Sequence, residues 1–360
     1  MTFDTLLRFG TLALVLFGGT SARAATIFNI TGTTGNIQAD AAFTAAANLW
    51  SGILMDDITV NIQRGVSSLG SGILAATTNN FTNYTYTQLR NALITDVTSA
   101  DDTNAVAHLS SGSSVGMLLN RTSNSPNGSG SATPYVDNDG DANNSTIHVS
   151  NANARALGLL APSAAIDGSI NYNNTSGFTW DFDPSDGITA GSYDFMGIVA
   201  HEIGHLLGFV SGVDILDGNA PPSGGPFADN LFAYVSVLDL YRYSASSTAS
   251  GVIDWTADTR SKYFSLDGGT SALGTFSTGV NFGDGRQASH WKDGLGLGIL
   301  DPTIANGELA QISALDLRAL DAIGWNLTTV PEPGSIALAM VGLLGMFAAK
   351  RRSARPTKLL

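Results

Sequence analysis

The sequence predicts an α/β (α+β) fold, in which a mixed, twisted sheet with helices is followed by a more irregular subdomain. Three patterns support this prediction. Apolar residues recur at helical spacing within residues 38–54, which is typical of a helix with one buried face. Apolar and polar residues alternate within 57–63, which indicates a half-buried strand. Residues 211–285 are rich in Gly, Ser and Asp with scattered aromatic residues, so we expect loops and short strands there.

The same apolar periodicity, together with capping and turn residues, predicts the positions of the other helices and strands. Asp194 is expected to cap the helix that contains residues 195–206, and Gly208 lies where that helix would stop. Ser313 and Asp316 approximate a capping box for a final helix. The expected elements in chain order are a strand at 27–30, a helix at 38–54, a strand at 57–63, a helix at 86–98, a surface loop at 110–134, a strand at 147–149, a short helix at 153–159, a helix within 191–209 and a helix at 313–323.

Residues 1–24 are expected to be a signal rather than part of the fold. They contain Arg8 near the start, an apolar run over 12–17 and the sequence Ala22-Arg23-Ala24. This order is typical of a secretory signal peptide that is cleaved before Ala25. The domain division that follows is an N-terminal subdomain over 25–210 and a C-terminal subdomain over 211–329.

Residues 330–360 have a different character. Val330-Pro331-Glu332-Pro333-Gly334 precedes a short apolar run over 335–349, and a basic cluster at 350–352 follows it. This order resembles the PEP-CTERM sorting signal of Gram-negative bacteria. The resemblance implies recognition by exosortase-type machinery, transient anchoring in the inner membrane through a short transmembrane segment, and a location outside the cell or on its surface.

Charge and cysteine content exclude some classes of function. Between the two expected signals the chain keeps 10 of 17 basic and 28 of 30 acidic residues. A surface this acidic argues against nucleic acid as a partner. The sequence has no cysteine, so no disulfide stabilises it, and a domain of this size does not need one.

The most informative motif is His201-Glu202-Ile203-Gly204-His205. Side chains at positions i and i+4 share a helix face, so His201 and His205 can bind one ion. Zinc held in this way keeps a water molecule, lowers the pKa of that water toward about 7, and requires a carboxylate that accepts a proton. We therefore expect His201 and His205 as zinc ligands and Glu202 as the general base of a metallopeptidase that acts on a protein or peptide substrate.

Catalytic zinc usually takes three protein ligands. The motif resembles that of metzincin-type zinc peptidases, whose compact pattern has a third histidine six positions after the second, where this chain has Ser211. Asp214 and Asp217 follow closely, and carboxylates also ligate zinc. His290, in Ala288-Ser289-His290-Trp291-Lys292, is the stronger candidate.

The sequence around these residues resembles leishmanolysin-type metzincins. In that group, HExxHxxGF is followed by a long insertion and then by a Ser-His-Trp segment. Here, the motif ends at Phe209, and the second segment begins at Ser289. The resemblance implies a zincin-like catalytic domain, with His290 as the third ligand. Leu300 stands where the group has the methionine of a turn beneath the metal, and leucine is close to methionine in volume.

Two further hypotheses remain open at this stage. Asp137-Asn138-Asp139-Gly140-Asp141 resembles a calcium loop, although it lacks the bidentate glutamate of an EF-hand, and a solvated turn before the strand at 147–149 is the alternative. The Gly-, Ser- and Asn-rich composition also fits an extracellular adhesion or matrix protein with a structural or vestigial zinc site. The resemblance to zinc peptidases also implies that a strand before the site helix, such as 147–150, pairs with extended substrate.

Overall fold

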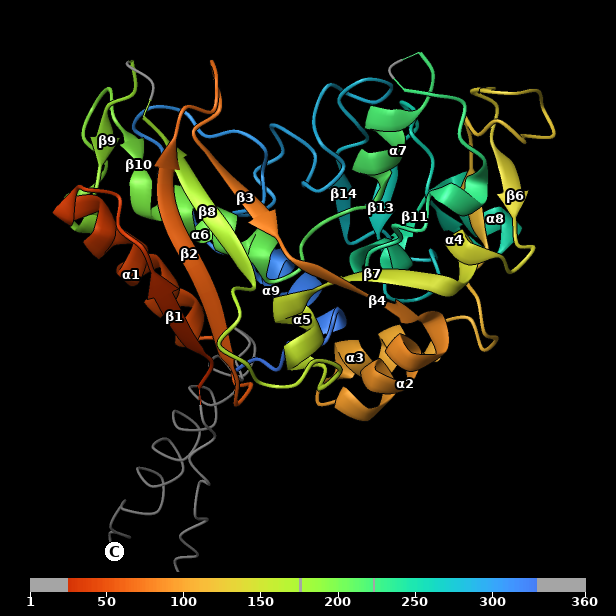
Figure 1. Ribbon diagram of the computed structural model, residues 1–360, viewed down its shortest axis with the longest axis horizontal. Helices are drawn as coiled ribbons and strands as arrows, with labels where there is room; N and C mark the ends of the chain where they lie inside the picture. The colour runs from red at the N-terminus through yellow and green to blue at the C-terminus, as the bar shows by residue number, and fades with distance from the viewer. Residues whose placement is uncertain (1–24, 175–176, 223, 329–360) are drawn as a thin grey trace, which may run out of the picture.

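Figure 1 shows the chain as a computed structural model, which describes residues 25–174, 177–222 and 224–328. The expected signal peptide over 1–24 and the expected sorting tail over 330–360, with its short transmembrane segment, lie outside the described residues. Among the residues that are described, no helix combines the length and the apolar character that crossing a membrane requires. The fold is mixed α/β, with several small sheets and helices, as the sequence predicts.

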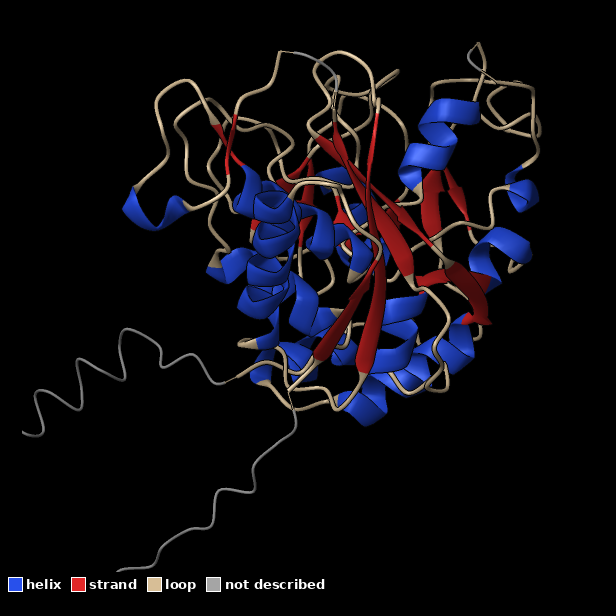
Figure 2. Cartoon of the chain, turned by 60° about the vertical axis from the view of Figure 1, so that its left-hand side comes forward, coloured by secondary structure: helices blue, strands red, loops and turns tan. Residues whose placement is uncertain are grey.

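The largest sheet is mixed. It contains β1 (Ile27–Thr31), β2 (Thr59–Ser67), β8 (Gly168–Asn173) and β3 (Ala75–Asn79), in the order β1-β2-β8-β3. The first three strands are parallel, whereas β3 is antiparallel to β8 and forms one edge. Val60, Ile62 and Ile170 are buried on one face of this sheet. Figure 2 shows its long strands running through the middle of the molecule.

Two helices, α1 (Ile37–Ser51) and α6 (Phe195–Leu206), pack against one another beside this sheet. Asn36 begins α1, because its side chain accepts hydrogen bonds from the next free backbone N–H groups. The indole Nε1 of Trp50 donates to the carbonyl oxygen of Ala200 at 2.9 Å, so α1 holds α6 at the turn that carries the first motif histidine. The sequence predicts this helix over 38–54, whereas α1 ends at Ser51, three residues earlier.

The remaining strands form four small sheets, in the orders β4-β7, β10-β9, β12-β5-β6 and β11-β13-β14. Because β12 pairs with β5, one of these sheets joins segments from both predicted subdomains. The strands are β4 (Phe81–Thr85), β5 (Met117–Leu119), β6 (Tyr135–Asp137), β7 (Thr146–Ser150), β9 (Trp180–Asp181), β10 (Tyr193–Asp194), β11 (Arg242–Tyr243), β12 (Ile253–Asp254), β13 (Lys262–Phe264) and β14 (Gly274–Phe276). The other helices are α2 (Tyr86–Asp96), α3 (Ala100–Ala107), α4 (Ala142–Ser145), α5 (Asn151–Ala156), α7 (Val213–Asn219), α8 (Ala245–Ser250) and α9 (Ala314–Ala322), with short 3₁₀ turns η1 (Pro184–Asp186), η2 (Asp229–Leu231) and η3 (Leu238–Tyr241).

Four tryptophans fill the core, and each indole N–H has an acceptor. A buried indole needs a hydrogen bond to offset the loss of water. Besides Trp50, Trp325 donates to the carbonyl oxygen of Leu207 just after α6, at 2.8 Å. Trp255 and Trp291 donate to the carboxylates of Asp239 and Asp316. The core is therefore hydrogen-bonded directly to both ends of the segment that carries the motif.

The two ends of the described chain meet at one place. The backbone N–H of Thr26 donates to the carbonyl oxygen of Leu54 at 3.3 Å, and that of Thr328 donates to the carbonyl oxygen of Ile53 at 2.8 Å. Leu54 also forms an isolated antiparallel bridge with Leu327. The chain thus enters and leaves the fold beside the segment that follows α1 (Figure 1).

Several carboxylates gather near this place, around Asn326. The amide of Asn326 donates to Asp96 and to Asp56, each at 3.1 Å. Burial and the neighbouring carboxylate of Asp56 raise the pKa of Asp96 to about 7. Burial also raises the pKa of Asp321 to about 7, and the carboxylate of Asp102 adds to that effect. Both groups therefore bind protons more tightly in the folded chain than in the unfolded chain.

This difference predicts a fall in stability with rising pH. From about pH 4 to pH 7 the folded chain retains protons that the unfolded chain has lost, since the ordinary pKa of an aspartate is 3.8. The free energy of unfolding should decrease across this window by an amount on the order of 2 kcal/mol, allowing for partial exposure. Asp96→Asn keeps an acceptor for Asn326 and should flatten the profile relative to the wild type. Urea unfolding at pH 5 and pH 8 measures the free energy of unfolding of both proteins. An equal decrease between the two pH values in the wild type and in Asp96→Asn would contradict the prediction.

Candidate metal centre

The first two candidate ligands lie on α6. Asp194 begins this helix by accepting a hydrogen bond from the N–H of Gly197 at 2.8 Å, and its carboxylate also accepts from the N–H of Ala310 at 3.1 Å. The cap fixes where the helix starts and therefore which face its histidines share. His201 and His205 follow one turn apart, with their Nε2 atoms 3.0 Å from each other.

The third imidazole comes from the loop after β14. The Nε2 atom of His290 lies 3.1 Å from that of His205 and 3.3 Å from that of His201. A tetrahedral zinc with Zn–N bonds of about 2.0–2.1 Å would separate its ligand nitrogens by about 3.3 Å. The structure therefore brings the three candidate histidines together at a spacing that suits one small ion.

The hydrogen bonds of the other ring nitrogens show which atoms carry protons. The Nδ1 atom of His201 lies 2.7 Å from the carbonyl oxygen of Ile299, and that of His205 lies 2.7 Å from the carbonyl oxygen of Phe209. A carbonyl oxygen only accepts, so each neutral ring carries its proton on Nδ1 and presents a lone pair at Nε2. Two such lone pairs 3.0 Å apart repel each other unless a cation lies between them. This donor set fits zinc.

Burial keeps the rings of His205 and His290 neutral. The side chains of His205 and His290 are only 9% and 7% exposed. Burial, and secondarily the neighbouring His201, lower the pKa of His205 to about 3. Burial and the other two rings also lower the pKa of His290 well below its ordinary value. Neutral imidazole is the form that ligates a metal.

Neither Asp214 nor Asp217 belongs to this group of converging ligand atoms. The carboxylate of Asp214 accepts hydrogen bonds from the backbone N–H groups of Ala288 and Ser289, at 2.6 and 3.1 Å, and also from the hydroxyl of Ser289. Asp217 accepts from two backbone N–H groups in the loop before this segment. Asp214 therefore fixes the residues just before His290, a role that no local sequence pattern indicates, since Asp214 and Ala288 are 74 residues apart.

The turn beneath the histidines contains Leu300, which is fully buried. A Cβ atom on Gly204, between the motif histidines, would stand 3.1 Å from the Leu300 side chain, so glycine leaves room for this packing. The carboxylate of Asp316 on α9 accepts from the N–H of Ile299 at 2.8 Å and from the Trp291 indole. The turn is thus held from α9, and it presents the Ile299 carbonyl to His201.

Glu202 lies on the same helix and is buried, with 6% of its surface exposed. Its Oε2 atom accepts a hydrogen bond from the hydroxyl of Thr77 on β3 at 2.7 Å. Burial raises the pKa of Glu202 above its ordinary value, while nearby His201 and the Thr77 hydroxyl lower it. Nothing in the local sequence around Glu202 indicated Thr77, which lies 125 residues earlier.

A second group of possible metal ligands includes part of the predicted calcium loop. Asp137, Asp139 and Asp229 each place one carboxylate oxygen within 4.8 Å of the others, and Asp141 is not in this group. Asp137 and Asp229 are buried, whereas Asp139 is exposed. The structure therefore adds Asp229 from a distant segment, and calcium binding there stays a prediction.

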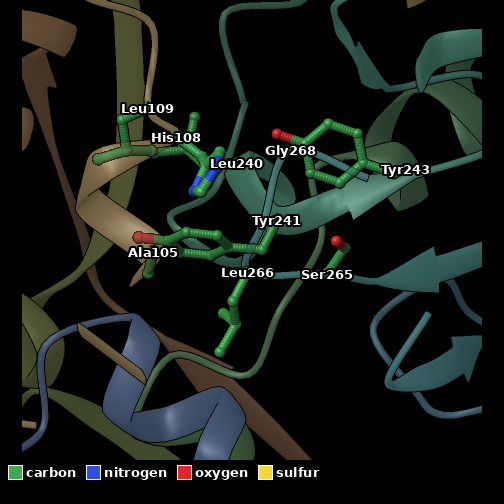
Figure 3. Close-up of a pocket in the computed structure, with 9 residues that line it drawn as sticks. All are labelled: Ala105, His108, Leu109, Leu240, Tyr241, Tyr243, Ser265, Leu266 and Gly268. Atoms are coloured by element: carbon green, nitrogen blue, oxygen red, sulfur yellow. The ribbon is translucent and has the colours of Figure 1, made fainter. Parts of the chain in front are cut away.

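Two hollows lie in the described part of the chain at positions where a ligand could bind. Figure 3 shows the first, where His108, Tyr241 and Tyr243 leave no continuous space for a water molecule. The second has a volume of about 490 Å³ and lies beside α6, where its lining includes Gly197 and Ala200. Ile299, whose carbonyl oxygen lies 2.7 Å from Nδ1 of His201, also lines this second hollow, so the hollow adjoins the candidate metal centre.

Comparison with protein-family models matches residues 329–352 to the PEP-CTERM protein-sorting motif. This match indicates an exported protein that is processed at its C-terminus in a Gram-negative bacterium, as the sequence predicts. It also implies recognition by exosortase-type sorting machinery. Comparisons with the curated proteins and with the solved structures found no match.

Proposed function

We propose that this chain is an exported zinc-dependent endopeptidase with a zincin-like fold, similar to leishmanolysin-type metzincins. The observation that carries the proposal is the convergence of three imidazole Nε2 atoms, all within 3.3 Å of one another, beside the buried carboxylate of Glu202. A zinc ion with a purely structural role would not require an adjacent general base. The helix that carries His201, Glu202 and His205 packs against a mixed sheet, which is consistent with the proposed fold.

In this proposal His201, His205 and His290 would hold zinc through neutral Nε2 atoms. Zinc in such a site supplies a Lewis acid that polarises the scissile carbonyl and makes water a nucleophile near neutral pH. Glu202 accepts the proton of the attacking water on its carboxylate and then donates it to the leaving amine nitrogen.

The substrate would lie along β3, not along the strand that contains 147–150. That strand, β7, pairs with β4 on one side and bridges to Val235 on the other, so both of its edges are occupied. By contrast, β3 is an edge strand, and Thr77 and Asn79 on it bond to α6. An extended peptide could add to this edge by backbone hydrogen bonds. The hollow of about 490 Å³ beside Ala200 would take an apolar side chain.

Removing the metal tests this proposal. Treatment of the full chain with a zinc chelator should abolish hydrolysis of an unfolded casein-type substrate, and added zinc should restore it, because the base alone cannot activate water or polarise the carbonyl. Metal content is measured on the same samples. Full hydrolysis by protein that contains no metal would overturn the proposal.

A further inference from the structure

One edge strand contacts the site helix through alternate side chains. Thr77 and Asn79 are two residues apart on β3, so they lie on the same face of the strand. The hydroxyl of Thr77 reaches both the backbone carbonyl and the side chain of Glu202, at 2.8 and 2.7 Å. The amide of Asn79 donates to the carbonyl oxygen of His205 at 2.9 Å. β3 is therefore hydrogen-bonded to α6 at two residues of the motif, Glu202 and His205.

The Thr77 hydroxyl has one proton and two acceptors within reach. An ionised carboxylate is the stronger acceptor, so the proton goes to Oε2 of Glu202. Among the described residues, Oε1 of the same carboxylate has no hydrogen bond of its own. One oxygen is thus fixed by β3, and the other stays available to accept a proton from water.

We propose that Thr77 is a positioning residue for Glu202. It holds the carboxylate in one orientation through Oε2 and so directs Oε1 at the reacting water; this inference rests on the proposed function. Threonine suits the task because its branched Cβ restricts the side-chain torsion on a strand, which fixes the direction of the hydroxyl. The base is buried, so water cannot supply a substitute donor without entering the site.

Kinetics of three variants test the role. Thr77→Val is nearly isosteric and lacks the hydroxyl, so kcat should fall about 10- to 100-fold with little change in KM, because the base is misdirected while substrate binding persists. Thr77→Ser keeps the donor and should recover most of kcat. The matched control is Thr95→Val, which removes a threonine hydroxyl bonded to the Asn91 carbonyl on the exposed side of α2. It should leave kcat unchanged.

A second measurement does not depend on activity. In metal-free protein, Thr77→Val should lower the midpoint of thermal unfolding when Glu202 is present and should have a smaller effect in a Glu202→Ala background, because the lost hydrogen bond is then already absent. Zinc content of Thr77→Val should match that of the wild type. An additive effect on the midpoint, or wild-type kcat in Thr77→Val, would overturn the positioning role. A wild-type chain without any zinc-dependent hydrolysis would instead overturn the proposed function.

Discussion

The Glu202→Gln variant should bind zinc as the wild type does and should lose peptide hydrolysis by about 10²- to 10⁴-fold in kcat, the range expected for removal of a general base. Glutamine has the shape of glutamate and can still accept the hydrogen bond from Thr77. It cannot take a proton from water. The measurement is a digestion of an unfolded protein substrate by equal amounts of wild type and variant, with zinc content determined for both.

This variant also separates the peptidase from the other class of function considered for the sequence. An adhesion or matrix protein with a structural or vestigial zinc site would show no hydrolysis in either protein. Equal, zinc-dependent hydrolysis by both proteins would remove Glu202 from its proposed role. Thr77→Val provides a second comparison, because its loss of kcat should be smaller than that of Glu202→Gln.

The His290→Ala variant should weaken zinc binding by about 10³-fold or more, because one of three protein ligands is lost. Competition with a chromophoric chelator measures this affinity. The matched variant is Asp214→Asn, which keeps an acceptor for the N–H of Ala288 but loses the charge that holds Ser289. It should weaken zinc by only about 10- to 100-fold, because Asp214 acts through the loop that carries the ligand.

The reverse order of effects would place Asp214 among the ligands. Asp217→Asn provides a further comparison, since the carboxylate of Asp217 accepts hydrogen bonds from the backbone of Asn281 and Phe282 in a neighbouring loop. Its zinc affinity should stay close to that of the wild type. A large loss there would mean that the whole loop region, rather than one histidine, determines binding.

Much of the candidate site could be predicted because its first half is local. His201, Glu202 and His205 lie close together on α6, and the helical period places His201 and His205 on one face. His290 was named partly because only five histidines exist in the chain and partly from the resemblance of its neighbours. The supports of the site were not predictable in this way. Thr77 and Asp214 support the site through hydrogen bonds between segments far apart in the chain, and no local sequence pattern predicts such bonds.

The same distinction applies to the fold. Long periodic segments such as α1 and α9 were placed to within a few residues, since each is amphipathic and capped by its own neighbours. The loop expected over 110–134 instead contains β5, three buried residues that pair with β6 on one side and with β12 on the other. Likewise α7 lies in a region read as loops and short strands, where Val213 and Leu216 bury its apolar side. Elements this short acquire their stability from distant partners.

The meeting of the two chain ends beside Ile53 and Leu54 has a consequence for maturation. The last backbone hydrogen bond of the described fold, from Thr328, precedes Pro331, where the Pro-Glu-Pro of the sorting motif begins. Cutting the chain near that motif breaks no contact within residues 25–328, so the hydrogen bonds that join the two ends beside Ile53 and Leu54 are kept after processing.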